Sequence, residues 1–214
     1  MPNNENLLAI IPVVHTIADN KFVLGDRLVE IGIGGPDIEA TLSAIAMAQA
    51  ELGHARLMYN WTFDLEGLIK KPEIQAQTGR AFQNVVAIHN WITLIAASYV
   101  VNLAVDLVIK EIIKSSTRQV GSHFEKYLVE QKDHIIYSEG WAMQLLNDEG
   151  AIPRKFKEAL SEVQNEVVQW LTSIETNKSL LEEQLISQNA SLVKRLNERI
   201  GQITKNSGVT ADVR

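Results

Sequence analysis

The sequence has 214 residues, of which 46% are hydrophobic and 21% charged, with 20 Lys and Arg against 26 Asp and Glu and a net charge of −6. This length and hydrophobic fraction suffice for a full core and exclude a chain that is disordered throughout. The absence of cysteine excludes disulfide scaffolds, thiolate zinc sites and cysteine nucleophiles, so any metal must be held by carboxylate, imidazole or carbonyl groups. The acidic balance, with no basic stripe, argues against a nucleic-acid partner.

The apolar segments of the chain do not have the pattern of a targeting or membrane segment. Residues Met1 to Asn6 are polar and acidic, unlike a secretory signal. The apolar, uncharged stretch 89–105 is shorter than the ~20 residues that span a bilayer, and it contains Asn90 and Asn102. We therefore predict a helix buried on most of its circumference, in a soluble cytoplasmic protein with no membrane partner.

The predicted elements are all helices. Between clusters of Gly and Pro, apolar residues recur at helical spacing without sustained strand-like alternation. The pattern predicts helices at 7–31, 37–66, 81–115, 118–147, 154–176 and 180–204. Asp37 is expected to cap the second helix, and Pro153 to begin the fifth. Short loops make the first four helices antiparallel neighbours, so we predict an all-α four-helix bundle with two additional C-terminal helices, as one domain over 1–204 with a disordered tail over 205–214.

The second predicted helix carries the sharpest chemical signal. Glu51 and His54, three positions apart, lie on one helical face and can both reach one metal ion. Ala44 and Met58 share their stripe, which predicts an interior position where a carboxylate needs a partner, a proton or a metal. Gly53, beside the pair, is expected to permit close approach of a neighbouring helix. The Glu-x-x-His pattern also occurs by chance, and an interior Glu–His hydrogen bond is the alternative interpretation.

Further candidates lie on the other three bundle helices. His134 is on an interior stripe of the fourth helix, where a di-metal carboxylate bundle would carry Glu at Gln131 and so repeat the Glu-x-x-His pair. The neutral amide of Gln131 does not offset cationic charge, and a core histidine explains His134 equally well. Asp106 in the third helix and Asp26 in the first could each contribute a carboxylate, although Asp26, next to Arg27, is also typical of an ion pair.

Several motifs together resemble a known family. They are Asp19-Asn20, Leu24-Gly25, Arg27-Leu28, Gly35-Pro36-Asp37-Ile38-Glu39, Leu52-Gly53-His54-Ala55-Arg56 and Glu130-Gln131-Lys132-Asp133-His134, the last followed by Ser138 and Trp141. Their order and spacing over residues 15–150 resemble the ferritin-like proteins of phenylacetate catabolism, and are similar to those of the structural subunit of phenylacetyl-CoA epoxidase.

The resemblance implies a ferritin-like bundle in a multisubunit monooxygenase that takes part in aromatic degradation. In that family a catalytic subunit holds a di-iron centre with four carboxylates and two histidines, and a homologous structural subunit has lost most of these ligands. Carried over position by position, Glu51, His54 and His134 match retained ligands. The other three ligand positions fall at Phe22, Asn102 and Gln131, which cannot bridge two cations.

This broken ligand set predicts a non-catalytic structural subunit that pairs with a homologous di-iron catalytic subunit, with a homodimer as another assembly. Glu51, His54 and His134 are expected to form a vestigial or weak metal site. Asp26 and Asp106 would complete it only if the helices shifted by about 5–6 Å. We expect no catalytic residue and no resident cofactor. If the partial site is occupied, iron is the expected ion. The alternative is a ferritin-like di-metal oxygenase or oxidase with a rearranged carboxylate and histidine site.

Overall fold

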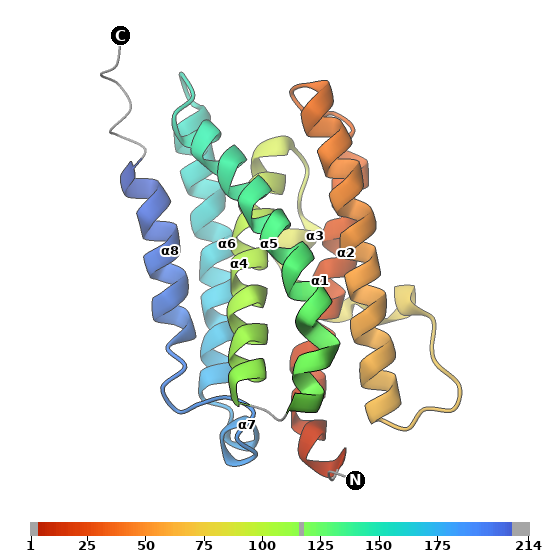
Figure 1. Cartoon of the computed structure of the whole chain (residues 1–214). Helices are drawn as coiled ribbons and strands as arrows, with labels where there is room; N and C mark the ends of the chain where they lie inside the picture. The colour runs from red at the N-terminus through yellow and green to blue at the C-terminus, as the bar shows by residue number, and fades with distance from the viewer. Residues whose placement is uncertain (1–3, 116–117, 207–214) are drawn as a thin grey trace.

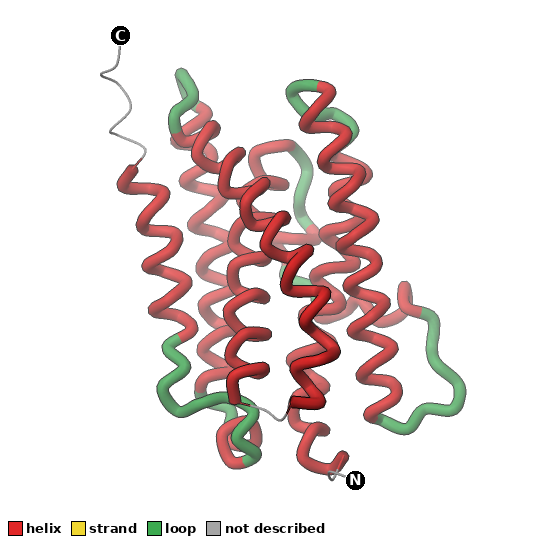
Figure 2. The backbone as a smooth tube through the Cα atoms, in the orientation of Figure 1, coloured by secondary structure: helices red, strands yellow, loops and turns green. Residues whose placement is uncertain are grey.

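The computed structural model describes residues 4–115 and 118–206, and every regular element in these ranges is a helix (Figures 1 and 2). The long helices are α1 (Ile11–Gly32), α2 (Ile38–Leu65), α4 (Trp91–Ser115), α5 (Arg118–Leu146), α6 (Ile152–Glu175) and α8 (Leu192–Asn206). The short ones are η1 (Asn4–Ile10), η2 (Ile74–Arg80), α3 (Gln83–Val86) and α7 (Lys178–Glu182). The predicted all-α fold is confirmed.

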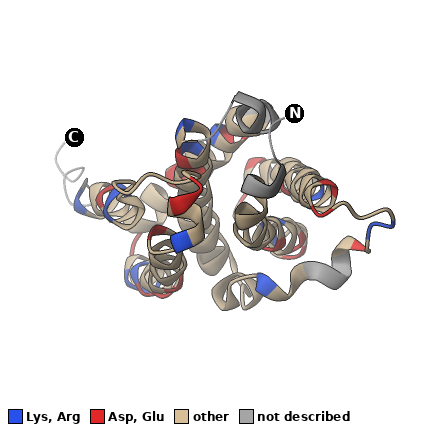
Figure 3. Ribbon diagram, turned by 90° about the horizontal axis from the view of Figure 1, so that it is seen from below, with Lys and Arg blue, Asp and Glu red and all other residues tan. Residues whose placement is uncertain are grey.

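Helices α1, α2, α4 and α5 form the four-helix bundle. α1 packs along α2, α4 packs along α5, and α6 and α8 cover the remaining face of α4 (Figure 1). Figure 3, seen along the helix axes, shows the long helices side by side, with acidic and basic residues both present on the outer helices. The predicted bundle with additional C-terminal helices is therefore confirmed.

Helix α4 is the centre of the core. Every residue from Leu94 to Ile109 is buried, so this helix is enclosed by its neighbours. Two segments of the described chain, Leu7–Gly32 and Trp91–Ser115, are long and apolar enough to cross a membrane by length and composition alone. Their most apolar windows are 61% and 89% buried inside the protein. The expectation of a helix buried around most of its circumference is confirmed.

Two predicted helix starts are confirmed. The Asp37 carboxylate accepts a hydrogen bond from the Ala40 N–H at 2.6 Å and so caps α2. Pro153 lies in the first turn of α6, where backbone N–H groups have no partner within the helix, so a residue without an N–H costs no hydrogen bond.

Two predicted helices are interrupted. The segment 81–115 divides into α3 and α4, because Asn90 leaves the helical path and its side-chain oxygen accepts from the Thr93 N–H at 2.9 Å. The segment 180–204 divides into α7 and α8, with Gln184 and Ser191 at φ of 55° and 50°. In the predicted tail, residues 205–206 belong to α8, and 207–214 lie outside the described residues.

The first two helices approach each other closely through glycines of α1. A Cβ added at Gly32 would lie 2.6 Å from the Ala44 Cβ, and one at Gly25 would lie 2.9 Å from the Leu52 Cγ. Gly53 was expected to have this role, but no described residue lies within 4 Å of the place for its Cβ, so that expectation is wrong. The close contact made by Gly25 and Gly32 brings the inner face of α1 onto α2.

Candidate functional site: a polar cluster centred on a buried lysine

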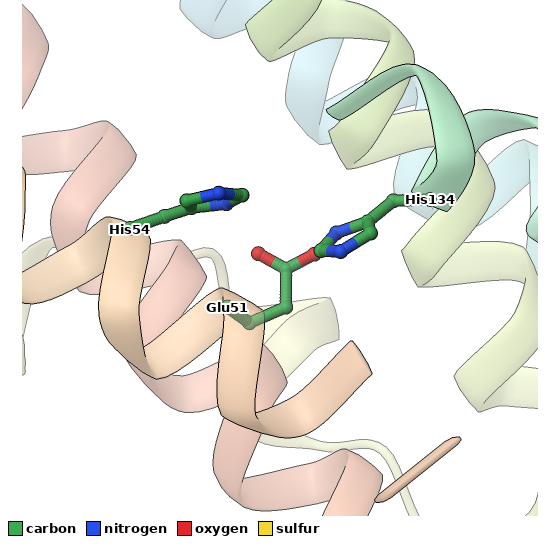
Figure 4. A group of neighbouring side chains, drawn as sticks. All are labelled: Glu51, His54 and His134. Carbon is green, nitrogen blue, oxygen red and sulfur yellow. The ribbon is translucent and has the colours of Figure 1, made fainter. Parts of the chain in front are cut away.

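Glu51 and His54 from α2 meet His134 from α5 inside the bundle. One ligand atom of each residue lies within 4.8 Å of those of the other two, and all three residues are buried. Figure 4 shows the Glu51 carboxylate between the two imidazole rings. Nδ1 of His134 lies 2.8 Å from Oε1 of Glu51, and Nε2 of His54 lies 2.7 Å from Oε2 of Glu130. The predicted grouping of these three residues is therefore present in the fold.

The Glu51 carboxylate of this cluster is paired with the ammonium group of Lys21, which is fully buried. Its Nζ lies 2.7 Å from Oε2 of Glu51. It also lies 2.6 Å from Oδ1 of Asn102 and 2.5 Å from Oε1 of Gln131. The two amide oxygens accept hydrogen bonds from the ammonium, and the Glu51 carboxylate is its ion-pair partner. The partners lie on α2, α4 and α5, so Lys21 joins all four bundle helices.

A second layer of contacts orients the two amides. Nε2 of Gln131 donates to the main-chain oxygen of Asn102 at 2.8 Å and to its Oδ1 at 2.9 Å. The Tyr127 hydroxyl donates to Oε1 of Gln131 at 2.8 Å, and the ring of Tyr127 lies 5.4 Å from Nζ of Lys21. The amide oxygens and the aromatic face are thereby directed at the cation.

The charges in the cluster are coupled. Burial by itself raises the pKa of the Glu51 carboxyl, but Lys21 and His134 beside it lower that pKa to about 2. Burial lowers the pKa of Lys21, and the Glu51 carboxylate opposes this effect. Burial and the Lys21 charge lower the pKa of His54. The three oxygens around Nζ favour the ammonium form of Lys21, and the lowered pKa of His54 favours its neutral imidazole.

The structure corrects the position that α1 contributes to the site. Phe22 is half-buried and lines a surface pocket between α1, α2 and the segment before η2, together with Asp26. Adjacent residues of a helix point about 100° apart, and it is Lys21 that faces the centre. The carboxylate of Asp26 is 64% exposed and lies 3.7 Å from Nη2 of Arg27. Asp26 therefore has the surface ion-pair position and does not reach the cluster.

Asp106 also lies outside the cluster. Its Oδ2 is 2.8 Å from Nζ of Lys110 one turn later in α4. It lines a groove of about 820 Å³ that also contacts Arg195 and Arg199 of α8. Its charge acts on Lys21 only from a distance. Asn102 and Gln131, in contrast, occupy the central positions that the family resemblance assigned to them.

The buried carboxylate of α1, that of Asp19, holds a connecting segment. Asp19 accepts hydrogen bonds from the Tyr59 hydroxyl at 2.5 Å and from the Arg80 N–H at 2.6 Å, while burial raises its pKa. Oδ1 of Asn20 accepts from the Phe82 N–H at 2.9 Å. These contacts fasten the chain between η2 and α3 to α1.

Sequence reasoning missed Lys21, although a signal was present. Lys21 shares its helical stripe with four buried apolar residues at spacings of three, four and seven: Val14, Ile17, Leu24 and Leu28. A charged residue in the middle of such a stripe predicts a buried charge that needs a partner. The contact of Glu130 with His54 was also missed. The position three residues before His134, where the family carries a ligand, is Gln131, so the adjacent Glu130 was not considered a site residue.

A pair of metal ions does not fit these residues. A di-metal carboxylate bundle draws a Glu from each of two helices and a Glu-x-x-His pair from each of the other two. Here α1 supplies a lysine, α4 supplies Asn102 and α5 supplies Gln131, which leaves Glu51 as the one carboxylate among the four described helices at these positions. Two cations would lack bridging carboxylates and would share their space with an ammonium.

Comparison with known proteins agrees with this architecture. A search of curated proteins found no match. The family model described as "Phenylacetic acid catabolic protein" matches residues 1–212, almost the whole chain. The chain therefore belongs to the phenylacetic acid catabolic protein family.

Proposed function

We propose that this chain is the non-catalytic structural subunit of a multicomponent phenylacetyl-CoA-type epoxidase in the cytoplasm, and that it pairs with a homologous di-iron catalytic subunit. The observation that carries the proposal is the ammonium of Lys21, held by Glu51, Asn102 and Gln131 where the family's catalytic members are expected to hold iron. A subunit that keeps the family's bundle without its metal ligands can serve as a scaffold, but it cannot hold the metal ions that activate oxygen.

The long helices give the proposed subunit its scaffold surface. Helix α1 packs along α2 and α4 along α5, so each pair presents a long helical face to which a second bundle of the same family can bind. The expected role is to bind the catalytic subunit along such a face and to hold it in the conformation that turns over substrate.

Co-expression with a di-iron catalytic subunit of the same family tests the proposal. We expect a stable complex in size-exclusion chromatography, iron that stays with the partner when the subunits are separated, and phenylacetyl-CoA-dependent oxygen consumption that needs both chains. Glu51→Gln in this chain should leave the iron content of the complex unchanged, whereas loss of a ligand in the partner should remove it.

Two results would reject the proposal. One is a catalytic subunit that turns over at its full rate without this chain and forms no complex with it. The other is two tightly bound iron or manganese ions per isolated chain, which would favour the oxygenase or oxidase alternative.

A further inference from the structure

We propose that Lys21 is a built-in cation that replaces a metal ion in this bundle, and that its ammonium group alone keeps Glu51, His54 and His134 from binding one. The inference goes beyond the proposed subunit role, because it concerns the isolated chain and holds whether or not a partner binds. It implies a latent transition-metal site one substitution away from the natural sequence.

The contacts of Lys21 are those of a cation at the centre of a coordination shell. Three oxygens from three helices converge on Nζ at 2.5–2.7 Å, and the fourth helix supplies the lysine itself. A metal in a helical bundle makes the same cross-links. Because the lysine is covalently part of α1, these cross-links persist without any ion in solution.

The same contacts occupy the Glu51 carboxylate. Its Oε2 is paired with Lys21, and its Oε1 accepts from Nδ1 of His134. A divalent ion would have to displace the first of these contacts and lie next to a positive charge in a site from which water is excluded. Coulomb repulsion at such distances and low effective dielectric is large, so Lys21 opposes metal binding directly.

Removal of the ammonium would leave a ligand set of recognised chemistry. Two histidines and one carboxylate form the facial triad that binds non-haem iron and related divalent ions. Their ligand atoms lie within 4.8 Å of one another, against roughly 3.4 Å for a tetrahedral ion with bonds of 2.0–2.1 Å. Metal binding would therefore draw the ligand atoms closer together by up to roughly 1.4 Å. Nδ1 of His54 has no hydrogen-bond partner among the described residues and is available as a ligand.

The test uses Lys21→Met, which keeps the length of the side chain and removes its charge. Purified wild type and variant are titrated with Co²⁺, and binding is followed by visible absorption and by the melting temperature. We expect one Co²⁺ per Lys21→Met chain with a higher melting temperature on binding, and no stoichiometric Co²⁺ or shift in the wild type. Lys110→Met, which removes an ammonium outside the cluster, should behave like the wild type.

Two double variants distinguish a metal site from a general loosening of the core. Lys21→Met with His54→Ala removes one ligand and should weaken Co²⁺ binding at least ~10-fold. Lys21→Met with Glu51→Gln removes both charges and should fold without metal and bind none. Should Lys21→Met fail to fold alone, Co²⁺ added during refolding is expected to restore the helical fold and its cooperative melt.

Contrary outcomes are equally clear. Stoichiometric Co²⁺ binding by the wild type would show that the ammonium does not exclude metal. A folded Lys21→Met chain that binds no Co²⁺, or an unfolded one that Co²⁺ does not rescue, would overturn the latent site. None of these outcomes depends on the catalytic subunit, so they are separable from the test of the proposed function.

Discussion

The Lys21–Glu51 ion pair sets the energetics of the cluster because neither group has access to water. The side chains of both residues are fully buried, and each is the principal opposite charge for the other. Breaking a buried pair by removing one member costs more than the pair itself contributes, because the remaining charge stays desolvated. The two members should therefore behave as a unit under mutation.

Glu51→Gln is expected to lower the free energy of unfolding by ~3–5 kcal/mol, since it leaves the ammonium of Lys21 buried without a carboxylate. Urea denaturation measures the change. Glu158→Gln is the matched control: its carboxylate is 60% exposed and 3.6 Å from Arg154, so the expected change is below ~1 kcal/mol. Equal effects of the two substitutions would contradict a charged, buried Glu51.

The pKa of Glu51 also predicts an acid-dependent loss of stability. The pKa of Glu51 in the folded protein is about 2, below the ordinary 4.5, so the folded protein takes up this proton at a lower pH than the unfolded chain does. The stability from this group is complete above pH 4.5, and it is lost as the pH falls from there toward 2, roughly 3 kcal/mol in all. Unfolding free energies of wild type and Glu51→Gln, measured against pH, should converge across this window. A constant difference would argue against the ionised form.

At the scale of elements, the contact between α1 and α2 depends on glycine. Gly32→Ala would improve helix propensity by about 1 kcal/mol, yet its Cβ would meet the Ala44 Cβ at 2.6 Å. Overpacking of this kind typically costs ~1–3 kcal/mol, so we expect net destabilisation in thermal or urea melts. Gly140→Ala in α5 places its new Cβ more than 4 Å from the described neighbouring residues and should stabilise the protein by up to ~1 kcal/mol. A higher free energy of unfolding for Gly32→Ala would mean that α1 and α2 can move apart at little cost.

The element boundaries show which signals are local. Asp37 was predictable as a cap because a capping side chain contacts a backbone N–H only three residues away. The partner that caps α3 was not, because its first N–H groups bond to the carboxylate of Glu166, which lies in α6 more than 80 residues later. Periodicity in a window of residues carries no information about such a partner.

At the scale of the whole molecule, the hairpin of α1 and α2 presents an apolar surface. Near its turn, five large apolar side chains are 37–69% exposed: Val29, Ile33, Ile38, Leu42 and Ile45. Ile38, Leu42 and Ile45 follow helical spacing, so they lie on one outward face of α2. Grouped exposed apolar residues mark protein contacts, and this face is our candidate for the catalytic subunit.

Leu42→Lys is expected to weaken the complex with the catalytic subunit by at least ~10-fold without changing the melting temperature of the isolated chain, because Leu42 is 61% exposed. Binding is measured by titration of the partner. Val86→Lys, at an apolar residue of α3 that is 46% exposed, is the matched control and should bind normally. Normal binding by Leu42→Lys would move the interface to another face.

The sequence by itself determined the helical bundle, the shared face of Glu51 and His54, and the neutral residues Asn102 and Gln131, because each follows from residue type and short-range spacing. Only the tertiary structure decided that Lys21, and not Phe22, faces the centre. The rotation of α1 about its axis depends on how its glycines pack against α2. The charge state of the cluster depends likewise on oxygens from residues 51, 102 and 131, which become neighbours only when the helices assemble. Long-range packing thus places the ammonium of Lys21 against Glu51, the carboxylate of the partial ligand set.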